Sequence, residues 1–132
     1  MTTIDKIAWI HLENGKLLCA RSKGKSIYYI PGGKREPGES DEQTLVREIE
    51  EELSVRIKPV TITHYGTFEA QADGKAEGVR VKISCFTGQY EGTINPASEI
   101  EELAWLGYGD IDRVSEASRL IFERLRADGL LN

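Results

Sequence analysis

Short apolar runs separated by polar turns make up the N-terminal part of the chain, a pattern typical of β-strands. Residues 6–11 and 16–20 are two such runs, joined by Glu13-Asn14-Gly15. Asn-Gly between two apolar runs favours a hairpin turn, so we expect these runs to pair. A third run, residues 27–30, stops at Pro31-Gly32-Gly33, where proline and glycine interrupt regular structure.

The four-residue spacing of apolar side chains predicts an amphipathic helix that begins after Ser40. Ser40 and Gln43 have the spacing of an N-terminal capping box. Ser54 stands where glycine commonly ends a helix, and a serine in the left-handed conformation costs about 1 kcal/mol, so the sequence does not fix the helix end. The apolar stripe consists of Leu45, Ile49 and Leu53.

The second half of the chain alternates between strand patterns and turns. We expect strands over residues 55–63, 65–70 and 103–106, and a loop over residues 72–78. Residues 79–84 alternate between apolar and polar side chains, which predicts a half-buried strand. Ser115 can cap a last helix that ends at Gly129. Strands combined with two helices predict an α/β fold with a mixed sheet between helices.

The composition is that of a soluble globular protein. The chain has 132 residues, of which 39 % are hydrophobic and 30 % charged, and we expect residues 1–132 to form one domain. No apolar run approaches the ~20 residues that span a bilayer, and we expect no secretory leader. Cys19 and Cys85 are isolated and lack metal-ligand spacing. These features predict a cytoplasmic protein without a membrane partner.

The negative charge is concentrated in one segment. Lysine and arginine number 17 and aspartate and glutamate 22, which gives a net charge of −5. Residues 39–52 alone hold seven acidic residues and one basic residue, so the rest of the chain carries a net charge of +1. This distribution excludes a generally basic nucleic-acid-binding protein. It also raises the question of which cation the acidic segment meets.

Three glutamates share one face of the predicted helix. Glu48, Glu51 and Glu52 are spaced i, i+3 and i+4, and their face lies about 120° from the apolar stripe. Only Arg47 offsets their mutual repulsion. Clustered carboxylates suit a hard divalent cation such as Mg²⁺, which also binds phosphate oxygens. Considered alone, however, an acidic helix face is more often a solvated surface.

The spacing of residues upstream of these glutamates favours the metal site over the solvated surface. Residues 33–55, GKREPGESDEQTLVREIEEELSV, resemble the signature of the Nudix hydrolase family, G-x5-E-x7-R-E-U-x-E-E-x-G-U, in which U is aliphatic. Ser54 replaces the last glycine of the signature, which removes no carboxylate. The resemblance implies a MutT-like α/β/α sandwich over the whole chain. The fixed positions filled here are Gly33, Glu39, Arg47, Glu48, Glu51 and Glu52.

The resemblance also implies a reaction and a cofactor. Nudix hydrolases cleave nucleoside diphosphates linked to another group, using Mg²⁺ or Mn²⁺. By resemblance, Glu51 and Glu52 would be the principal metal ligands, and Glu48 would be a further ligand or would orient the attacking water. The backbone carbonyl of Gly32 would also face the metal. The structural positions of the signature would be Gly33, Glu39 and Arg47, the last orienting the carboxylates.

Further candidates occupy places that carry function in family members. A glutamate shortly before the strand at residues 103–106 would be a metal ligand or general base, and we choose Glu99, with Glu102 as the alternative. Arg21, at the end of the second strand, would reach substrate phosphate. The candidate substrate-binding residues are Arg21, Tyr28, Tyr29 and Lys34. Positive potential near the entrance would come from Lys23, Lys25, Lys34 and Arg35.

Substrate markers of particular family members are absent. Ala70 stands where ADP-ribose-type members commonly carry proline, and Gln71 and Ala72 stand where dinucleoside-polyphosphate members tend to carry tyrosine. Ser115 and Ser118 occupy the region in which some relatives use asparagine to read oxidised guanine. The short chain instead resembles members that hydrolyse (deoxy)nucleoside triphosphates.

We therefore expect a pyrophosphohydrolase that acts on a nucleoside triphosphate or a similar small nucleotide. The expected cofactor is Mg²⁺, with Mn²⁺ as the alternative, and no nucleic acid is expected as a partner. Open alternatives are a nucleotide sugar or dinucleoside polyphosphate as substrate, a non-catalytic ligand-binding module, and an acidic protein-interaction domain. Dimers are frequent among relatives, so a homodimer also stays open.

Overall fold

The computed structural model describes residues 2–72 and 74–132, and their strands form two sheets and a short two-stranded ribbon. The first sheet has the order β4-β1-β7-β6. It is a mixed sheet, because β1 and β7 are parallel whereas the other neighbours are antiparallel. Its strands are β1 (Thr2–Trp9), β4 (Gly32–Lys34), β6 (Thr63–Gln71) and β7 (Val79–Thr87).

The second sheet is antiparallel and has the order β2-β3-β9. Its strands are β2 (Leu12–Glu13), β3 (Lys16–Ser22) and β9 (Ile100–Leu106). The ribbon pairs β5 (Arg56–Ile57) with β8 (Tyr90–Glu91). The helices are α1 (Asp41–Leu53), α2 (Glu116–Ala127) and the 3₁₀ turns η1 (Pro59–Thr61) and η2 (Tyr108–Arg113).

Asn14 and Gly15 form the predicted hairpin turn, but the pairing before it is shorter than expected. Both residues have positive φ, 53° and 75°, as a two-residue type I′ turn requires. The strand that pairs with β3 is the short β2, whereas β1 lies in the other sheet beside β7. The His11 carbonyl accepts the Leu18 amide at 3.0 Å, so the chain joins the second sheet at His11. The sequence pattern predicted the turn correctly and the extent of pairing wrongly.

The ends of α1 follow from local side-chain chemistry. The Gln43 amide donates to the Ser40 hydroxyl at 3.1 Å, and the Ser40 amide donates to the Gln43 side chain at 2.9 Å, which confirms the capping box. Ser54 ends the helix in the left-handed conformation, with φ of 65°. The predicted apolar stripe is fully buried and consists of Leu45, Ile49 and Leu53.

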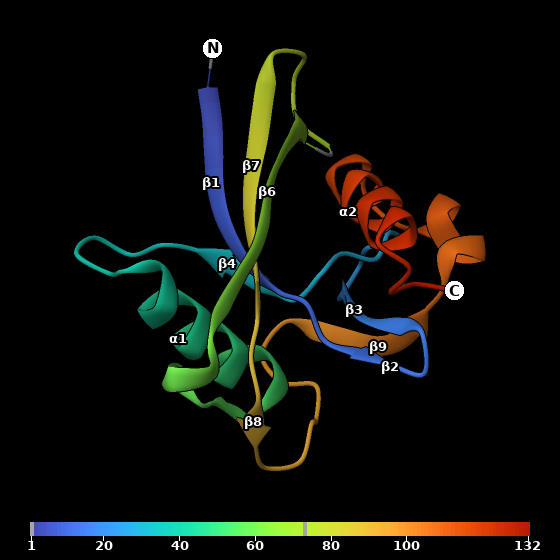
Figure 1. Ribbon diagram of the computed structural model, residues 1–132. Coiled ribbons are helices and arrows are strands. Elements are labelled where there is room, and N and C mark those ends of the chain that lie inside the picture. The colour runs from blue at the N-terminus through green and yellow to red at the C-terminus, as the bar shows by residue number, and fades with distance from the viewer. Residues whose placement is uncertain (1, 73) are drawn as a thin grey trace.

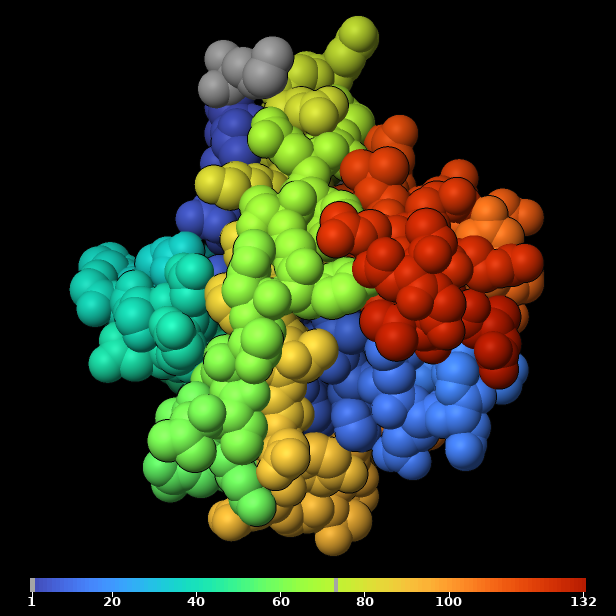
Figure 2. All heavy atoms as spheres, viewed as in Figure 1, coloured from blue at the N-terminus to red at the C-terminus, as the bar shows by residue number. Residues whose placement is uncertain are grey.

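The two faces of the sheet around β1 belong to different cores. Because side chains alternate along a strand, Ile7 and Trp9 pack in the core that includes the α1 stripe. Ile4 and Ala8 belong to the core that α2 covers. Figure 1 shows α1 and α2 on either side of the sheet, and in Figure 2 the surface of β6 lies between them. The predicted α/β layering with a mixed sheet between helices is confirmed.

Two of the predicted strands are interrupted. Pro59 has no amide hydrogen to donate, and residues 55–63 form only the two residues of β5 before η1 begins. In residues 27–30, Tyr28 and Tyr29 make isolated bridges to Val114 and Ala20 rather than a continuous ladder. This segment is therefore an irregular connection that leads to the glycines at the start of β4.

The remaining elements form close to their predicted positions. The Ser118 amide donates to the Ser115 hydroxyl at 3.3 Å at the start of α2, and Gly129 follows its end with φ of 76°. The predicted loop over residues 72–78 includes residue 73, which lies outside the described residues. Within the described residues no helix has both the length and the apolar character that crossing a membrane demands.

Candidate active site

Arg47 organises the acidic face of α1, which comprises Glu48, Glu51 and Glu52. Its guanidinium donates two hydrogen bonds to Glu39, from Nε at 2.7 Å and from Nη2 at 2.9 Å. Its Nη1 donates to Glu48 at 2.9 Å and to Glu51 at 3.0 Å. Charge-assisted bonds with this fork geometry are strong and directional. One arginine therefore links the loop before the helix to two carboxylates of the acidic face.

Glu48 rests against Gly33 in β4. A Cβ atom at Gly33 would overlap the Glu48 carboxylate, so the glycine leaves the space that this carboxylate occupies. The Glu48 side chain is 17 % exposed. Burial raises its pKa, although the hydrogen bond from Arg47 opposes the shift. The first glycine of the sequence signature thus has a steric role toward one of its glutamates.

Glu52 is a buried carboxylate that the protein compensates only weakly. It is 5 % exposed, and its Oε1 accepts the backbone amide of Gly32 at 3.1 Å. Burial raises the pKa of Glu52 to about 8 despite that bond, and the charges of Glu48 and Glu99 act in the same direction. A cation bound beside this carboxylate would remove most of that penalty.

Glu99 reaches the acidic face from a distant part of the chain. The segment before β9 is bonded to the last turn of α1, where the Ala97 amide donates to the Glu52 carbonyl at 2.9 Å. From there the charge of Glu99 contributes to raising the pKa of both Glu48 and Glu52. The structure therefore brings Glu99 close to the acidic face.

Glu102 and Arg21 are engaged with each other. They face one another across β3 and β9, and the Arg21 Nη2 donates to Glu102 at 3.0 Å. The Nη1 of Arg21 donates to the Lys25 carbonyl, also at 3.0 Å. Arg21 does not line the cleft described below; it secures the loop that carries Lys25.

The donor set of the acidic face suits a hard divalent cation. Carboxylate oxygens are the ligands that Mg²⁺ and Mn²⁺ prefer, and Glu52 brings a buried carboxyl group whose hydrogen bond comes from a backbone amide. Glu51 is the outermost of the three, with its side chain 50 % exposed. Among residues 2–72 and 74–132, no three acidic, histidine or cysteine side chains already converge on one point. Instead Arg47 holds Glu48 and Glu51, and the Gly32 amide holds Glu52.

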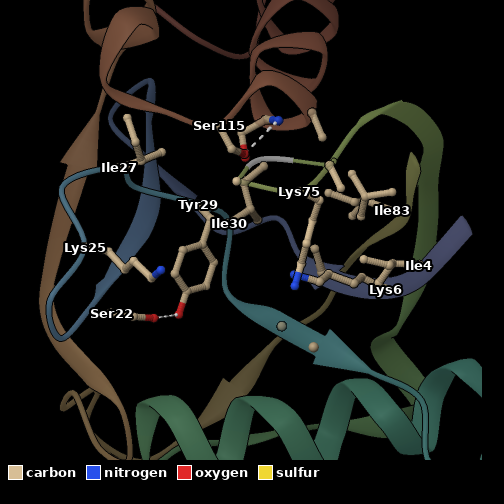
Figure 3. A pocket seen from close by; sticks show the side chains of 18 of the residues that line it. Ile4, Lys6, Ser22, Lys25, Ile27, Tyr29, Ile30, Lys75, Ile83 and Ser115 are labelled. Carbon is tan, nitrogen blue, oxygen red and sulfur yellow. Dashed lines mark hydrogen bonds between the residues drawn. The ribbon is translucent and has the colours of Figure 1, made fainter. Parts of the chain in front are cut away.

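A cleft of about 520 Å³ opens beside Gly32 and Gly33. β1, β7, the segment before β4, the loop after β6 and the start of α2 all contribute to its walls. Figure 3 shows Tyr29 on one side of this space and Lys6 with Lys75 on the other. The apolar part of the lining includes Ile4, Ile30, Val81 and Ile83. Both the volume and the mixture of apolar and polar groups suit a small-molecule ligand of nucleotide size.

The two neighbouring tyrosines have different surroundings. Tyr29 lines the cleft, its hydroxyl is 2.9 Å from that of Ser22, and burial raises its pKa to about 12. Tyr28 is buried in the α2-side core, with the Arg113 guanidinium 5.1 Å from its ring centre. Lys34 lies outside the cleft lining, on the strand at its edge.

Lys6 and Lys75 line the cleft but were not among the sequence candidates. For Lys6 a signal existed: it stands between Ile4 and Ala8 at a position where the strand alternation requires an apolar side chain. Lys75 carried no comparable signal, because nothing local predicts which way a loop lysine points.

Replacing Glu39 by glutamine tests the Arg47 network. We expect a lower free energy of unfolding at pH 7, because the fork from Arg47 loses its charged partner. The folded-state pKa of Glu39 is lowered to about 2 by Arg47, so this contribution is full above the unfolded value near 4.5 and is lost as pH falls toward 2. Urea unfolding of both proteins at pH 7 and pH 3 should show the difference shrinking at the lower pH.

Glu50→Gln is the matched control for that comparison. Glu50 is an exposed glutamate of the same helix, outside the Arg47 network. An effect of Glu50→Gln as large as that of Glu39→Gln would contradict the role assigned to the fork.

Comparison with known proteins places this arrangement in context. The profile of the NUDIX domain matches residues 4–125 of the chain. A nucleoside triphosphatase, NudI, from Enterobacter sp. (strain 638) is 29 % identical over 120 residues, covering 80 % of this chain and 84 % of that protein. A CTP pyrophosphohydrolase from Escherichia coli (strain K12) is 31 % identical over 110 residues, covering 80 % of this chain and 76 % of that protein.

Solved structures give the same fold. The solution structure of the E. coli ORF135 protein has a TM-score of 0.74 at 26 % identity and covers 97 % of this chain and 94 % of that chain. A MutT NUDIX hydrolase from Burkholderia pseudomallei has a TM-score of 0.76 at 19 % identity, with 95 % of this chain and 99 % of that chain covered.

Proposed function

The chain belongs to the Nudix family of hydrolases, and from that premise we propose that it cleaves nucleoside triphosphates to nucleoside monophosphates and pyrophosphate with the help of Mg²⁺. The observation that carries the proposal is the weakly compensated carboxylate of Glu52, which lies beside Gly32 at the edge of the cleft. Family members use divalent cations, and a bound cation would offset the burial that raises the pKa of this carboxyl. Mn²⁺ is the alternative ion, because both metals take oxygen ligands.

The metal would be held by residues from three parts of the chain. Glu48, Glu51 and Glu52 would supply carboxylates from α1, and Glu99 would approach from the segment before β9. The carbonyl of Gly32 would add a backbone donor. Arg47 would keep two of these carboxylates oriented through its existing hydrogen bonds.

Hydrolysis would be a displacement at phosphorus. A divalent cation, when bound, neutralises phosphate oxygens and lowers the pKa of water. Water adds to one phosphorus of the anhydride between the first and second phosphates, the bond from that phosphorus to the bridging oxygen breaks, and nucleoside monophosphate and pyrophosphate separate. A carboxylate oxygen of Glu48 or Glu99 would accept the proton of the attacking water. The hydroxyl of Tyr29 and the lysines of the cleft would contact the phosphate chain.

The cleft supports a nucleotide rather than a larger substrate. Its apolar walls, which include Ile4 and Ile83, offer a surface for the nucleoside, and its glycine edge adjoins the acidic face. The relatives named a nucleoside triphosphatase and a CTP pyrophosphohydrolase act on substrates of this class, which supports a triphosphate here.

We further propose that residues 1–132 form one catalytic domain that works in the cytoplasm. Cys19 and Cys85 are buried free thiols, which supports a reducing compartment.

A panel of nucleotides tests the proposed function. We expect the purified protein to release pyrophosphate from nucleoside triphosphates in the presence of Mg²⁺ and none in the presence of EDTA. The measurement is chromatographic separation of the monophosphate product, with pyrophosphate assayed in parallel. A folded protein that binds nucleotides without cleaving them in Mg²⁺ or Mn²⁺ would instead be a ligand-binding module. Absence of both binding and cleavage would favour an interaction domain.

A further inference from the structure

Lys6 is a cation among apolar side chains of β1 and β7. In β1 it shares a face with Ile4 and Ala8, which belong to the α2-side core, and across the parallel pair it stands opposite Ile83. Its other neighbour in register is Lys34 of β4, and like charges directly opposite each other destabilise a sheet. Burial and the charge of Lys34 lower the pKa of Lys6, and Lys75 acts in the same direction, whereas the carboxylates of Glu52 and Glu48 act in the opposite one. Burial and the facing Lys34 therefore make a lysine costly for folding at this position.

Lys75 reaches the same wall of the cleft from the loop after β6. Gln71 holds this loop, since its amide nitrogen donates to the Ala76 carbonyl at 2.8 Å and its side-chain oxygen accepts the Gly78 amide at 3.2 Å. The ammonium groups of Lys6 and Lys75 lie near each other in Figure 3. Two like charges are thus directed into one space by separate parts of the chain.

Lys25 stands on the opposite wall, beside Tyr29. Its loop is held by the hydrogen bond from Arg21 to the Lys25 carbonyl and by the bond from the Lys25 amide to the Ser22 carbonyl at 3.1 Å. Gly32 and Gly33 line the same cleft. The cationic groups therefore share this cleft with the glycines that adjoin the acidic face.

Within the part of the chain that the structure describes, these three lysines have no carboxylate partner inside the cleft. Among the described residues, the lining contains no aspartate or glutamate, and none of the three lysines forms an ion pair. Unpaired cations converging on a partly buried space are costly without an anion, and an ammonium binds phosphate oxygens well as a compact point charge.

We propose that Lys6 and Lys75 on one wall and Lys25 on the other hold the two ends of the substrate's phosphate chain, so that the enzyme selects nucleoside triphosphates over nucleotide sugars. This inference rests on the proposed function. A terminal phosphate carries about −1.5 to −2 charges at pH 7, whereas a sugar in the same place carries none. The lysines would thus discriminate between substrates by the number of charged phosphates, whereas the acidic face would carry out cleavage.

Neutral substitutions that keep the shape of lysine test this selection. Lys6→Met and Lys75→Met should each lower kcat/KM for UTP about tenfold, the size expected for one charge-assisted contact, and change kcat/KM for UDP-glucose little. The ratio of the two values therefore falls in each variant. Lys82→Met is the matched control, because Lys82 is exposed on the opposite face of β7; its ratio should equal that of the wild type. Thermal unfolding of each variant confirms folding, and Lys6→Met should unfold at the same temperature as the wild type or higher.

Binding separates this inference from the proposed function. Calorimetric titration with the non-hydrolysable α,β-methylene analogue of UTP should give a Kd about tenfold weaker for Lys6→Met and Lys75→Met than for the wild type and Lys82→Met. If the wild type cleaves no nucleotide yet shows this pattern, the reaction is wrong and the lysine contacts stand. If the wild type cleaves nucleotides but the variants have the Kd and the kcat/KM ratio of the wild type, the lysine proposal is wrong and the proposed reaction stands.

Discussion

Replacing Glu52 by glutamine should lower kcat by on the order of 10³-fold while leaving the fold intact, because several kcal/mol of transition-state stabilisation depend on the metal that this carboxylate would hold. Glutamine has nearly the same shape, and its carbonyl oxygen can still accept the Gly32 amide. The substitution therefore removes a charge and little else. Loss of activity in a protein that stays folded distinguishes a metal ligand from a residue needed only for packing.

The same substitution should raise the stability of the metal-free protein even though it lowers kcat. The folded-state pKa of Glu52 is raised to about 8 by burial, so in metal-free protein this group costs stability once pH rises above its unfolded value near 4.5, and the cost grows until pH passes the folded value. Glu52→Gln lacks this group. In EDTA, Tm of the variant should exceed that of the wild type at pH 8, and the gap should close near pH 4.5.

Added Mg²⁺ should reverse that order, since a ligand that binds only the folded wild type raises its Tm by mass action. Differential scanning fluorimetry with and without Mg²⁺ measures this directly, and Glu50→Gln serves as the control on the same helix. The assignment is wrong if Glu52→Gln keeps wild-type turnover, or if Mg²⁺ raises the Tm of the variant as much as that of the wild type.

Local chemistry allowed most of α1 and its flanks to be predicted. The capping box at Ser40 and the stripe that includes Leu45 depend on contacts within a few residues, and such contacts are visible in a sequence. The same holds for the turn at Asn14 and Gly15, whose φ values are positive. Pairing over long distances is different: nothing near residues 6–11 indicates that β1 joins β7 instead of β3.

The candidate site shows the same division between local and distant information. Glu48, Glu51 and Glu52 share a face because helical spacing places them there. The approach of Glu99 depends on a bond between the Ala97 amide and the Glu52 carbonyl, which joins segments far apart in the chain. Without the family resemblance, Glu99 and its neighbour Glu102 would have been indistinguishable.

The cleft was the least predictable part. Arg21 has the charge expected of a phosphate ligand, yet its hydrogen bonds go to Glu102 and to the Lys25 carbonyl. Lys6 was overlooked because a lysine within a strand is commonly read as solvent-exposed. The alternation along the strand places it on one face with Ile4 and Ala8, and the tertiary structure shows that this face turns toward the α2-side core.

Replacing Gly33 by alanine should lower kcat about 10²-fold with little change in Tm, a loss of the size that a displacement of about 1 Å can cause. The backbone of Gly33 is not in the left-handed region, so alanine introduces no strain there. The three atoms nearest to its new Cβ atom all belong to the carboxylate of Glu48, the far end of a flexible side chain. Glu48 can turn aside without unfolding the protein, but it would then leave the acidic face that it shares with Glu52.

Alanine substitutions at two other glycines serve as controls for this prediction. Gly109→Ala should leave activity and Tm unchanged, because a Cβ atom there meets no neighbouring atom and φ is not positive. Gly32→Ala should lower Tm strongly, because φ is 151° and the new Cβ would overlap the backbone carbonyl of Ile7 in β1. The backbone of a strand cannot move aside as a glutamate side chain can. Glycine-to-alanine substitutions at positions 32 and 33 should therefore differ: the first affects folding and the second affects catalysis.

A double-mutant cycle shows whether Gly33 acts through Glu48. If the alanine harms turnover only by displacing that carboxylate, then Gly33→Ala should have almost no further effect on kcat in a Glu48→Ala background, where the side chain is already gone. Independent contributions would instead make the two losses multiply. Multiplying losses, or full activity of Gly33→Ala alone, would show that the position of the Glu48 carboxylate is not what this glycine protects.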